Sequence, residues 1–351
     1  MKVAMIGCGN IANNAHIPAY LKNPDAELAY FCDILPDRAE AAVAKYGCGK
    51  AITDYREALA DKTVDVVSVC TPNHMHAEIS IAAMRAGKDV LCEKPIARTY
   101  DEALTMQRAQ HETGRLLAIG VCNRFSDSVN RIKQYIDQGK LGDVYHVHAS
   151  FRAHRSIPGL GGAFTTKAIA GGGALIDWGV HFLDVVMYCT GDPKPRTVSG
   201  EMFGRLGRDV EGYVYKDMWA GPPIKDGTYD VEDSVTALVR TEGPVVTLHG
   251  AWAQNIGEDE MYIDFMGDKA GIRLHYGSDF TLYSVENGAL LSATPVFTMR
   301  NMYENEINAF VKCVQTGEKP ASHVDTVLTS ARVMQAIYDS AAAHRELALE
   351  D

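Results

Sequence analysis

Short apolar runs alternate with amphipathic segments through the first third of the chain. The expected strands are residues 3–6, 28–32, 64–70, 89–92 and 116–121, and the expected helices are a segment ending at residue 20 and residues 38–46, 55–59, 76–86 and 100–113. Near-continuous apolar strands separated by helices are typical of a parallel sheet that helices cover on both sides. The pattern therefore predicts an α/β domain with a doubly wound parallel sheet.

The pattern changes after residue 124. A linking helix is expected at residues 129–138, strands at residues 144–151, 231–239, 245–252, 261–266 and 271–275, and amphipathic helices at residues 302–314 and 326–344. Successive strands joined by short turns favour an antiparallel sheet. We therefore expect two domains: residues 1–122, and residues 123–351 as an α+β domain with a large, mainly antiparallel open sheet. The last helices could pack back on the first domain.

Composition narrows the class of partner. The chain has 351 residues, enough for two cores, and its 46% hydrophobic and 23% charged residues are typical of a globular protein. Its formal net charge of -11, with no concentrated basic run, repels nucleic-acid phosphates. A small-molecule partner is expected, and nucleic acid is not.

Location is predicted from the start of the chain and from the cysteines. The first strand begins at once, which leaves no room for a signal peptide, and no uninterrupted apolar run reaches the roughly 20 residues of a membrane span. The eight cysteines are scattered singly, without Cys-x-x-Cys pairs. We expect a cytoplasmic protein with reduced, mostly buried thiols, no membrane partner and no zinc framework.

A glycine motif follows the first strand. Gly7-Cys8-Gly9-Asn10-Ile11-Ala12 matches Gly-x-Gly-x-x-Gly/Ala, and Gly7, Gly9, Asn10 and Ile11 are the candidate cofactor residues. Glycines allow a tight turn and close approach of the backbone to a pyrophosphate, which the following helix N-terminus attracts. A glycine-rich turn without a ligand is the alternative.

Asp33 ends the second expected strand, at the distance from the glycines where a carboxylate holds an adenosine ribose. An extra 2'-phosphate about 4 Å away would be repelled by roughly 4 kcal/mol at an effective dielectric constant of 20. NAD is therefore expected rather than NADP, although the nearby Arg38 weakens the preference.

Polar residues also collect at the ends of later strands. The candidates are Thr71, Pro72, Asn73 and His76 after the third long strand, Glu93 and Lys94 after the fourth, and Asn123 and Arg124 after the fifth. Ligands of doubly wound sheets bind beyond the carboxyl ends of the strands. These residues are therefore expected to border the cofactor, with Arg124 bordering either cofactor or substrate.

A second cluster of polar residues interrupts an apolar segment that follows Gly171, Gly172 and Gly173. Asp177, His181 and Asp184 stand at i, i+4 and i+7, which places them on one face of a helix. For the helix alone, a satisfied core histidine and an aspartate near a helix start are favoured over a catalytic role, and a metal-binding Asp/His pair is the third alternative. A nearby Lys94 would oppose a cation, so no metal is expected.

These motifs together resemble one family. Thr71-Pro72-Asn73-His74-x-His76, then Glu93-Lys94-Pro95, then the segment from Gly171 to Asp184 with its Asp-x-x-x-His, are similar in order and spacing to the glucose-fructose oxidoreductase/inositol dehydrogenase family (Gfo/Idh/MocA). The resemblance spans the whole chain. It implies an N-terminal Rossmann domain, a sugar or cyclitol substrate, and a homodimer or homotetramer formed through the open sheet.

The resemblance also implies that Lys94, Asp177 and His181 form the active set. A neutral imidazole suits His181 to take the hydroxyl proton while hydride passes to NAD+, and Lys94 would donate to the developing carbonyl oxygen. Asp177 would bind substrate and orient its neighbours. The resemblance further implies that Glu93 contacts the nicotinamide-side ribose and that Pro95 follows a cis peptide bond.

The expected function is NAD-dependent oxidation of a secondary hydroxyl of a sugar, glycoside or inositol. The alternatives are a redox-neutral, NAD-dependent glycosidase and a non-catalytic NAD-binding sensor, against which the intact Lys94, Asp177 and His181 argue. Arg152, Lys167 and Asp184 are further substrate candidates with capping or surface roles as alternatives. Residues 204–228 lack periodicity and predict a long loop, either a functional lid or an ordinary insertion.

Overall fold

The computed structural model describes residues 1–349 and divides into two compact units. Unit 1 comprises Met1–Ser126 and Arg300–Leu328, and unit 2 comprises Asp127–Met299 with the residues from Thr329 onward. The first division thus falls after Ser126, whereas the sequence suggested residue 122. A C-terminal segment also returns to unit 1.

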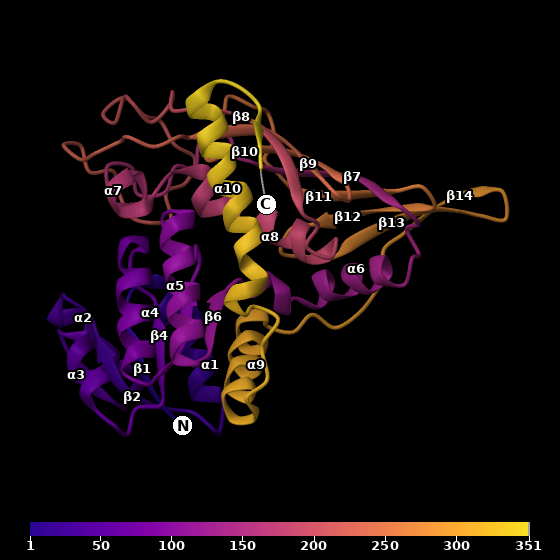
Figure 1. Cartoon of the computed structure of the whole chain (residues 1–351). Coiled ribbons are helices and arrows are strands. Elements are labelled where there is room, and N and C mark those ends of the chain that lie inside the picture. The colour runs from indigo at the N-terminus through magenta and orange to yellow at the C-terminus, as the bar shows by residue number, and fades with distance from the viewer. Residues whose placement is uncertain (350–351) are drawn as a thin grey trace. The chain divides into compact units, whose positions relative to one another are not determined.

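The sheet of unit 1 is wholly parallel, as predicted. Its order is β3-β2-β1-β4-β5-β6 (Figure 1). The strands are β1 (Lys2–Ile6), β2 (Glu27–Cys32), β3 (Lys50–Ile52), β4 (Val66–Val69), β5 (Asp89–Glu93) and β6 (Leu117–Gly120). The strand order reverses between β1 and β4, where doubly wound sheets bind their ligands. The sequence did not predict β3, which is too short to give an apolar run.

Helices connect these strands. They are α1 (Ile17–Lys22), α2 (Pro36–Tyr46), α3 (Tyr55–Ala60), α4 (His76–Arg85), α5 (Tyr100–Thr113) and α9 (Met302–Thr316), with a π-helical turn η1 (Ala12–His16) and 3-10 turns η2 (Asn73–Met75) and η3 (Cys122–Phe125). Clear end signals explain why the bounds of α5 were predicted correctly. The Thr99 side chain accepts the N–H of Glu102, and Gly114 ends the helix at a φ of 66°.

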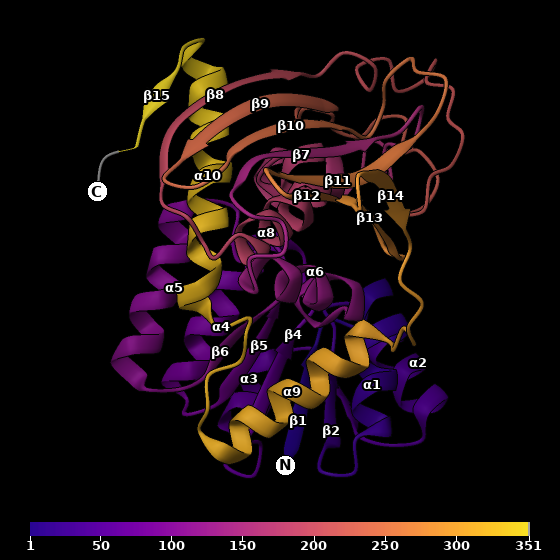
Figure 2. The ribbon, with the colours of Figure 1, turned by 90° about the vertical axis from the view of Figure 1, so that its right-hand side faces the viewer.

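Helix α9 belongs to unit 1 although it lies late in the sequence. Its Ile307 and Phe310 are buried in one core with Phe31 of β2 and with Ile17 and Tyr20 of α1. Figure 2 shows α9 in front of β1 and β2. Helix α9 thus contributes to the core of unit 1.

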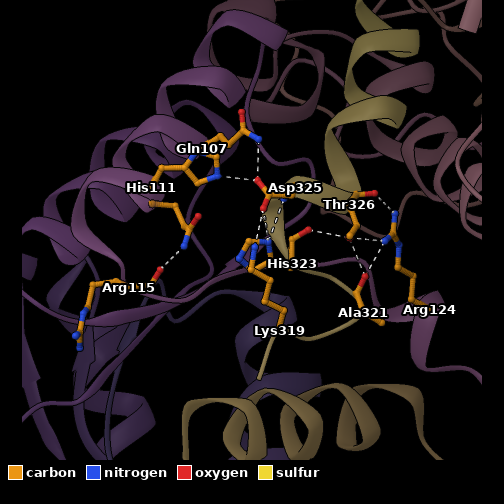
Figure 3. Close-up of polar contacts among 10 residues, drawn as sticks. Gln107, His111, Arg115, Arg124, Lys319, Ala321, His323, Asp325 and Thr326 are labelled. Carbon is orange, nitrogen blue, oxygen red and sulfur yellow. Dashed lines mark hydrogen bonds and ion pairs between the residues drawn. The ribbon is translucent and has the colours of Figure 1, made fainter. Parts of the chain in front are cut away.

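A polar cluster in unit 1 fixes the segment that follows α9 (Figure 3). One oxygen of Asp325 accepts from Gln107 Nε2 at 2.7 Å and faces His111 Nε2 at 3.0 Å, and the other lies 3.0 Å from Lys319 Nζ. The ring of His323 is buried beside it, with Nδ1 accepting the N–H of Asp325. Burial raises the pKa of Asp325, but these hydrogen bonds outweigh it and hold the pKa at about 2.

Unit 2 contains a sheet of nine strands in the order β14-β13-β12-β11-β7-β10-β9-β8-β15. The strands are β7 (Val144–Arg152), β8 (Pro195–Phe203), β9 (Ser234–Thr241), β10 (Val245–Ala251), β11 (Glu260–Gly267), β12 (Ala270–His275), β13 (Phe280–Glu286), β14 (Ala289–Ala293) and β15 (Leu347–Ala348). The pairs are antiparallel except for β7 and β10, which run parallel. The predicted large, mainly antiparallel sheet is confirmed. A parallel pair needs a long crossover, here the helices and strands between β7 and β10.

Helices cover one face of this sheet. The helices of unit 2 are α6 (Asp127–Asp137), α7 (Lys167–Ala170), α8 (Val180–Cys189) and the part of α10 (Val324–Ala343) from Thr329, with a 3-10 turn η4 (Ala163–Thr165) and a π-helical turn η5 (Leu175–Gly179). Figure 2 shows the sheet curving over α8 and α6. Phe151 of β7 contacts Phe182 of α8, with ring centroids 5.0 Å apart. Residues 204–228 contain neither helix nor strand, as predicted.

The segment Lys167–Cys189 has the length and hydropathy of a membrane span. However, 78% of its most apolar window is buried inside unit 2, as expected for the core helix of a globular protein. It is weak evidence for a membrane. All eight cysteines are free, and all except Cys48 are buried.

The hydrogen bonds around Asp325 predict that its ionised carboxylate stabilises the folded protein and that this stabilisation is lost in acid. Because the folded-state pKa lies below its ordinary value of 3.8, the stabilisation is present above about pH 4 and is lost as the pH falls toward 2. We expect the free energy of unfolding of the wild-type protein to fall over this range by about 1–2 kcal/mol more than that of Asp325→Asn. Asp339→Asn, an exposed position on the same helix, is the control. Parallel pH profiles in urea denaturation would contradict the prediction.

Candidate functional site

The glycine turn after β1 lies against the end of β4. Gly7 has a φ of 94°, and a Cβ there would lie 2.4 Å from the carbonyl oxygen of Cys70. Only glycine fits this position without displacing backbone. A Cβ on Gly9 would meet no atom within 4 Å, so the turn has open space on that side. The turn thus offers bare backbone at the reversal point of the sheet.

Asp33 is fixed against this turn. It follows β2 and is 8% exposed, with Oδ2 accepting the N–H of Cys8 at 3.0 Å and Oδ1 accepting the N–H of Leu35 at 3.0 Å. These two bonds leave acceptor capacity on both oxygens. Arg38 is exposed in the first turns of α2.

The loop after β4 contains a buried hydroxyl without a hydrogen-bond partner among the described residues, and it is held by a buried histidine side chain. Thr71 Oγ1 is buried and has no hydrogen-bond partner among the residues that the structure describes. His76 is fully buried, with Nδ1 2.8 Å from the carbonyl oxygen of Pro95 and Nε2 2.9 Å from that of Thr71. Burial lowers the pKa of His76, although both carbonyl contacts act in the opposite direction. The predicted cofactor residue His76 therefore joins two loops from within and presents no surface to a ligand.

Glu93 fixes the backbone of Lys94. It is 5% exposed; its Oε1 lies 2.7 Å from His16 Nε2, and its Oε2 accepts the N–H of Lys94 at 3.0 Å. His16 Nδ1 in turn contacts Ser68 Oγ at 3.1 Å. Burial raises the pKa of Glu93, but the hydrogen bond and charge of His16 and the charge of Lys94 outweigh it, so the pKa is lowered. Glu93 is an ionised positioning group.

No sequence pattern pointed to His16, which stands in η1 far from Glu93 in the chain. The two meet because β1, β4 and β5 are neighbours in the parallel sheet. The Lys94–Pro95 peptide is cis, as the resemblance implied.

In unit 2, Glu232 holds the turn that carries the second polar cluster. Its side chain accepts the N–H of Gly173 at 2.9 Å and of Leu175 at 3.0 Å, and the hydroxyl of Tyr338 at 2.9 Å. A Cβ on Gly173 would lie 1.9 Å from the carbonyl oxygen of Glu232, so glycine is required there. Burial raises the pKa of Glu232 even against these hydrogen bonds.

Asp177 is 7% exposed and lies within the π-helical turn η5. The indole of Trp252, which is fully buried, donates to Asp177 Oδ2 at 3.2 Å. His181 is in α8, partly buried, with its ring 6.4 Å from that of Tyr276. Because η5 is a π-turn, the expected regular α-helical spacing of Asp177 and His181 is interrupted. Such turns are frequent at functional sites.

Comparison with known proteins identifies the family. The family model described as "Oxidoreductase family, NAD-binding Rossmann fold" matches residues 1–121, and "GFO/IDH/MocA C-terminal domain" matches residues 129–273. The chain is 32% identical over 344 residues to a D-glucoside 3-dehydrogenase of Escherichia coli (strain K12), covering 97% of this chain and 95% of that protein. This protein belongs to the Gfo/Idh/MocA oxidoreductase family.

Other members of the Gfo/Idh/MocA family match along the full length. An inositol 2-dehydrogenase of Rhizobium meliloti (strain 1021) is 25% identical over 355 residues and covers 99% of both chains. The solved structure of a levoglucosan dehydrogenase in complex with NADH and levoglucosan has a TM-score of 0.84 at 22% identity, covering all of both chains. Unit 1 is accordingly the NAD-binding Rossmann domain of a Gfo/Idh/MocA protein.

The residues of unit 1 fit NAD. Gly7 and Gly9 expose backbone at the reversal point, Asp33 offers acceptor capacity beside them, and the buried Thr71 Oγ1 lacks a partner among the described residues. Asn10 is exposed at the turn, and Ile11 precedes η1. Pro72 and Asn73 begin the 3-10 turn η2 after Thr71. Roles in cofactor binding for these residues stay predictions.

The remaining candidates have structural partners. The buried guanidinium of Arg124 donates to the carbonyl oxygens of Ala321 and Thr326 at 2.7 and 2.9 Å, and to the hydroxyl of Thr326 (Figure 3). Asp184 is 1% exposed and accepts from Ser330 at 3.4 Å. These contacts explain both residues without a ligand.

Arg152 pairs with Glu260. Since Phe151 faces α8, the alternation of β7 places Arg152 on the opposite face, away from the helix of Asp177 and His181. We therefore assign Arg152 to the sheet rather than to the substrate. Lys167 begins α7, where its N–H donates to Asp230 at 2.6 Å; a substrate role for its side chain stays a prediction.

Two further features of the described residues lie apart from this site or are missing. Among the described residues, no group of three His, Cys, Asp or Glu side chains is arranged to hold a metal ion. A cavity of about 490 Å³ in unit 1 is lined by residues including Val64, Lys88, Asp89 and Arg115. These residues stand at the amino ends of strands, the opposite edge from Gly7 and Lys94.

The placement of Asp33 predicts cofactor preference. We expect Asp33→Asn to weaken NADH binding and to shift the ratio of NADPH to NADH affinity toward NADPH by about 10- to 100-fold, because a full negative charge no longer faces the 2'-phosphate. Binding is measured by the fluorescence of the reduced nicotinamide. Asp37→Asn, exposed in α2, is the control. An unchanged ratio would show that Asp33 does not face the adenosine ribose.

Proposed function

We propose that this protein is an NAD-dependent dehydrogenase that oxidises a secondary hydroxyl of a sugar, glycoside or inositol. The observation that carries the proposal is that Lys94 and Asp177 both occur on backbone held in place by a buried carboxylate, Glu93 in unit 1 and Glu232 in unit 2. The dehydrogenase relatives support the same reaction class. Fixed chemical groups are what catalysis by orientation requires.

The roles follow from the chemistry of each side chain. NAD+ supplies the hydride acceptor when bound. His181 takes the hydroxyl proton, because a neutral imidazole is a base near neutral pH. The ammonium group of Lys94 donates to the substrate oxygen and stabilises the negative charge that develops there. Asp177 accepts a hydrogen bond from another substrate hydroxyl, with its carboxylate oriented by Trp252.

A panel of sugars, inositols and nitrophenyl glycosides tests the proposal, with NADH absorbance and released nitrophenol followed together. NADH accumulation with a free sugar, glycoside or inositol is the expected result. Nitrophenol release that requires NAD+ without NADH accumulation would instead identify a redox-neutral glycosidase. NAD binding with neither signal would favour a sensor and overturn the proposal.

The working location is part of the same proposal. Eight free thiols suit a reducing compartment, so we propose a cytoplasmic enzyme acting on small carbohydrates or cyclitols.

We also propose that the protein is a homodimer or homotetramer assembled through the uncovered face of the large sheet. That face carries half-exposed or exposed apolar side chains on several strands: Phe203, Val245, Tyr283, Val285 and Leu290. Figure 2 shows α6 and α8 on the other face of the sheet, and exposed apolar side chains of this kind mark interaction surfaces. The family resemblance gives a second copy as the partner.

For the chemical roles, Lys94→Ala and His181→Ala are each expected to lower kcat by about 100-fold or more, while NAD+ binding persists. The reason is that each removes a proton donor or acceptor from the reaction without removing the glycine turn. Stopped-flow and steady-state NADH formation measure the effect. Lys62→Ala and His275→Ala, both exposed, serve as matched controls. Normal turnover in either active-set variant would refute that residue's role.

For assembly, Val245→Asp and Tyr283→Asp should yield monomers in light scattering after gel filtration, where the wild-type protein gives two or four copies. In a symmetric interface, the introduced carboxylate either faces the same carboxylate of the second copy or is removed from water without a partner. Tyr145→Asp is the control, because Tyr145 is also exposed on a strand but its alternation places it on the other face. A monomeric wild-type protein, or unaltered mass in both variants, would disprove this interface.

A further inference from the structure

The long connection between β8 and β9 is anchored at its root by one buried carboxylate. Asp233 is 1% exposed, and its Oδ2 accepts the N–H groups of Arg205 at 2.8 Å and Leu206 at 2.6 Å as well as the hydroxyl of Tyr229 at 2.9 Å. The beginning and the end of the loop therefore meet on the same atom. This loop, residues 204–230, is therefore held in unit 2 by hydrogen bonds at both of its ends.

The loop packs backbone to backbone on the segment between β7 and α7. Its Ile224 donates to the carbonyl oxygen of Leu160 at 2.8 Å, and Asp230 to that of Thr165 at 3.1 Å. A Cβ on Gly161 would lie 2.2 Å from the carbonyl oxygen of Ile224, so the two chains approach as closely as glycine permits. Figure 1 shows these loops beside α7.

Two large aromatic residues of this packed loop remain exposed, Trp219 and Tyr215. Trp219 is 49% exposed, and its ring meets the edge of Phe164 in a T-shaped contact with centroids 4.9 Å apart. By contrast, Tyr213 in the same loop is 7% exposed. A fixed loop that leaves a tryptophan half in solvent presents an apolar ring surface to a ligand or partner.

The same core connects this aromatic pair to Asp177. Phe164 and Trp178, the neighbour of Asp177, both pack against a buried cluster that contains Tyr213 and Trp252. Trp252 donates its indole N–H to Asp177 and its backbone N–H to the carbonyl oxygen of Asp233 at 2.8 Å. The residue that orients Asp177 is thus bonded to the residue that anchors the loop.

We propose that Trp219 and Phe164 form a subsite for the ring attached to the sugar that is oxidised, so that the natural substrate is a glycoside rather than a free inositol or monosaccharide. This inference rests on the proposed function and names its substrate class. Ligand sites combine apolar and aromatic walls with a few polar groups that fix orientation. Here Asp177 supplies a polar group for the sugar hydroxyls, and the Trp219 ring offers its face to the aglycone or to a second sugar.

The test compares substrates that share the oxidised sugar, which the panel identifies. Kinetic constants are measured for the free sugar, its methyl glycoside and its phenyl glycoside. With Trp219→Ala and Phe164→Ala we expect KM for the phenyl glycoside to rise about three- to tenfold, since aromatic contacts of this kind contribute roughly that much. The constants for the free sugar should stay within about twofold. Tyr215→Ala, an exposed aromatic residue of the same loop, is the matched control.

Equal losses for free sugar and phenyl glycoside would show that Trp219 only supports the fold, and unchanged constants for all three substrates would overturn the subsite. Trp219→Phe keeps a ring and should restore most of the affinity, which separates ring contact from a folding defect. Calorimetric binding of the phenyl and methyl glycosides to the NADH-bound protein gives a readout without turnover. If the wild-type protein binds the phenyl glycoside more tightly than the methyl glycoside and Trp219→Ala abolishes this preference, the subsite is supported even if no sugar is oxidised. Absence of oxidation alone refutes the proposed function.

Discussion

The geometry of the second polar cluster depends on the Glu232 carboxylate binding the N–H groups of Gly173 and Leu175. A helix start leaves N–H groups without intrahelical partners, and a buried start is stable only if another group accepts them. Glu232 does so at the cost of burying a carboxylate, which raises its pKa. The close approach requires glycine at position 173, and the turn held in this way carries Asp177 two positions beyond Leu175.

The same device recurs at three other turns of the chain. Asp33 accepts from the glycine turn, Glu93 accepts from the N–H of Lys94, and Asp233 accepts from the root of the long loop. A carboxylate that bonds to a backbone N–H fixes the backbone and leaves the side chain of that residue available for chemistry. The hydrogen bond to the carboxylate therefore holds the backbone from which the functional side chain extends.

Periodicity and end signals made most elements predictable, as the Thr99 cap and Gly114 show for α5. The motifs also located the family and the cofactor. Partners brought together by the fold could not be predicted: His16 meets Glu93 only because β1, β4 and β5 are neighbours, and Trp252 meets Asp177 across unit 2. Likewise, the sequence did not show that the carbonyl oxygen of Pro95 contacts His76, or that the carbonyl oxygen of Ala321 accepts from Arg124. Spacing reveals which residues share an element, but not which elements supply their partners.

This difference bears on substrate choice. The residues proposed to perform hydride chemistry act on a hydroxyl and its carbon, which every sugar and inositol offers, so their motifs carry no information about the rest of the substrate. To distinguish one substrate from another, the protein must contact the parts of the molecule in which the substrates differ. A binding surface rejects a wrong substrate because protein groups on that surface are then left without their partners. In unit 2, a surface that contacts the rest of the substrate must be structurally connected to Asp177 if both are to bind the same molecule. The bonds of Trp252 to both Asp177 and Asp233 supply that tie, because a shift of the loop root moves the acceptor of the Trp252 backbone and, through the indole, the carboxylate that would bind the sugar.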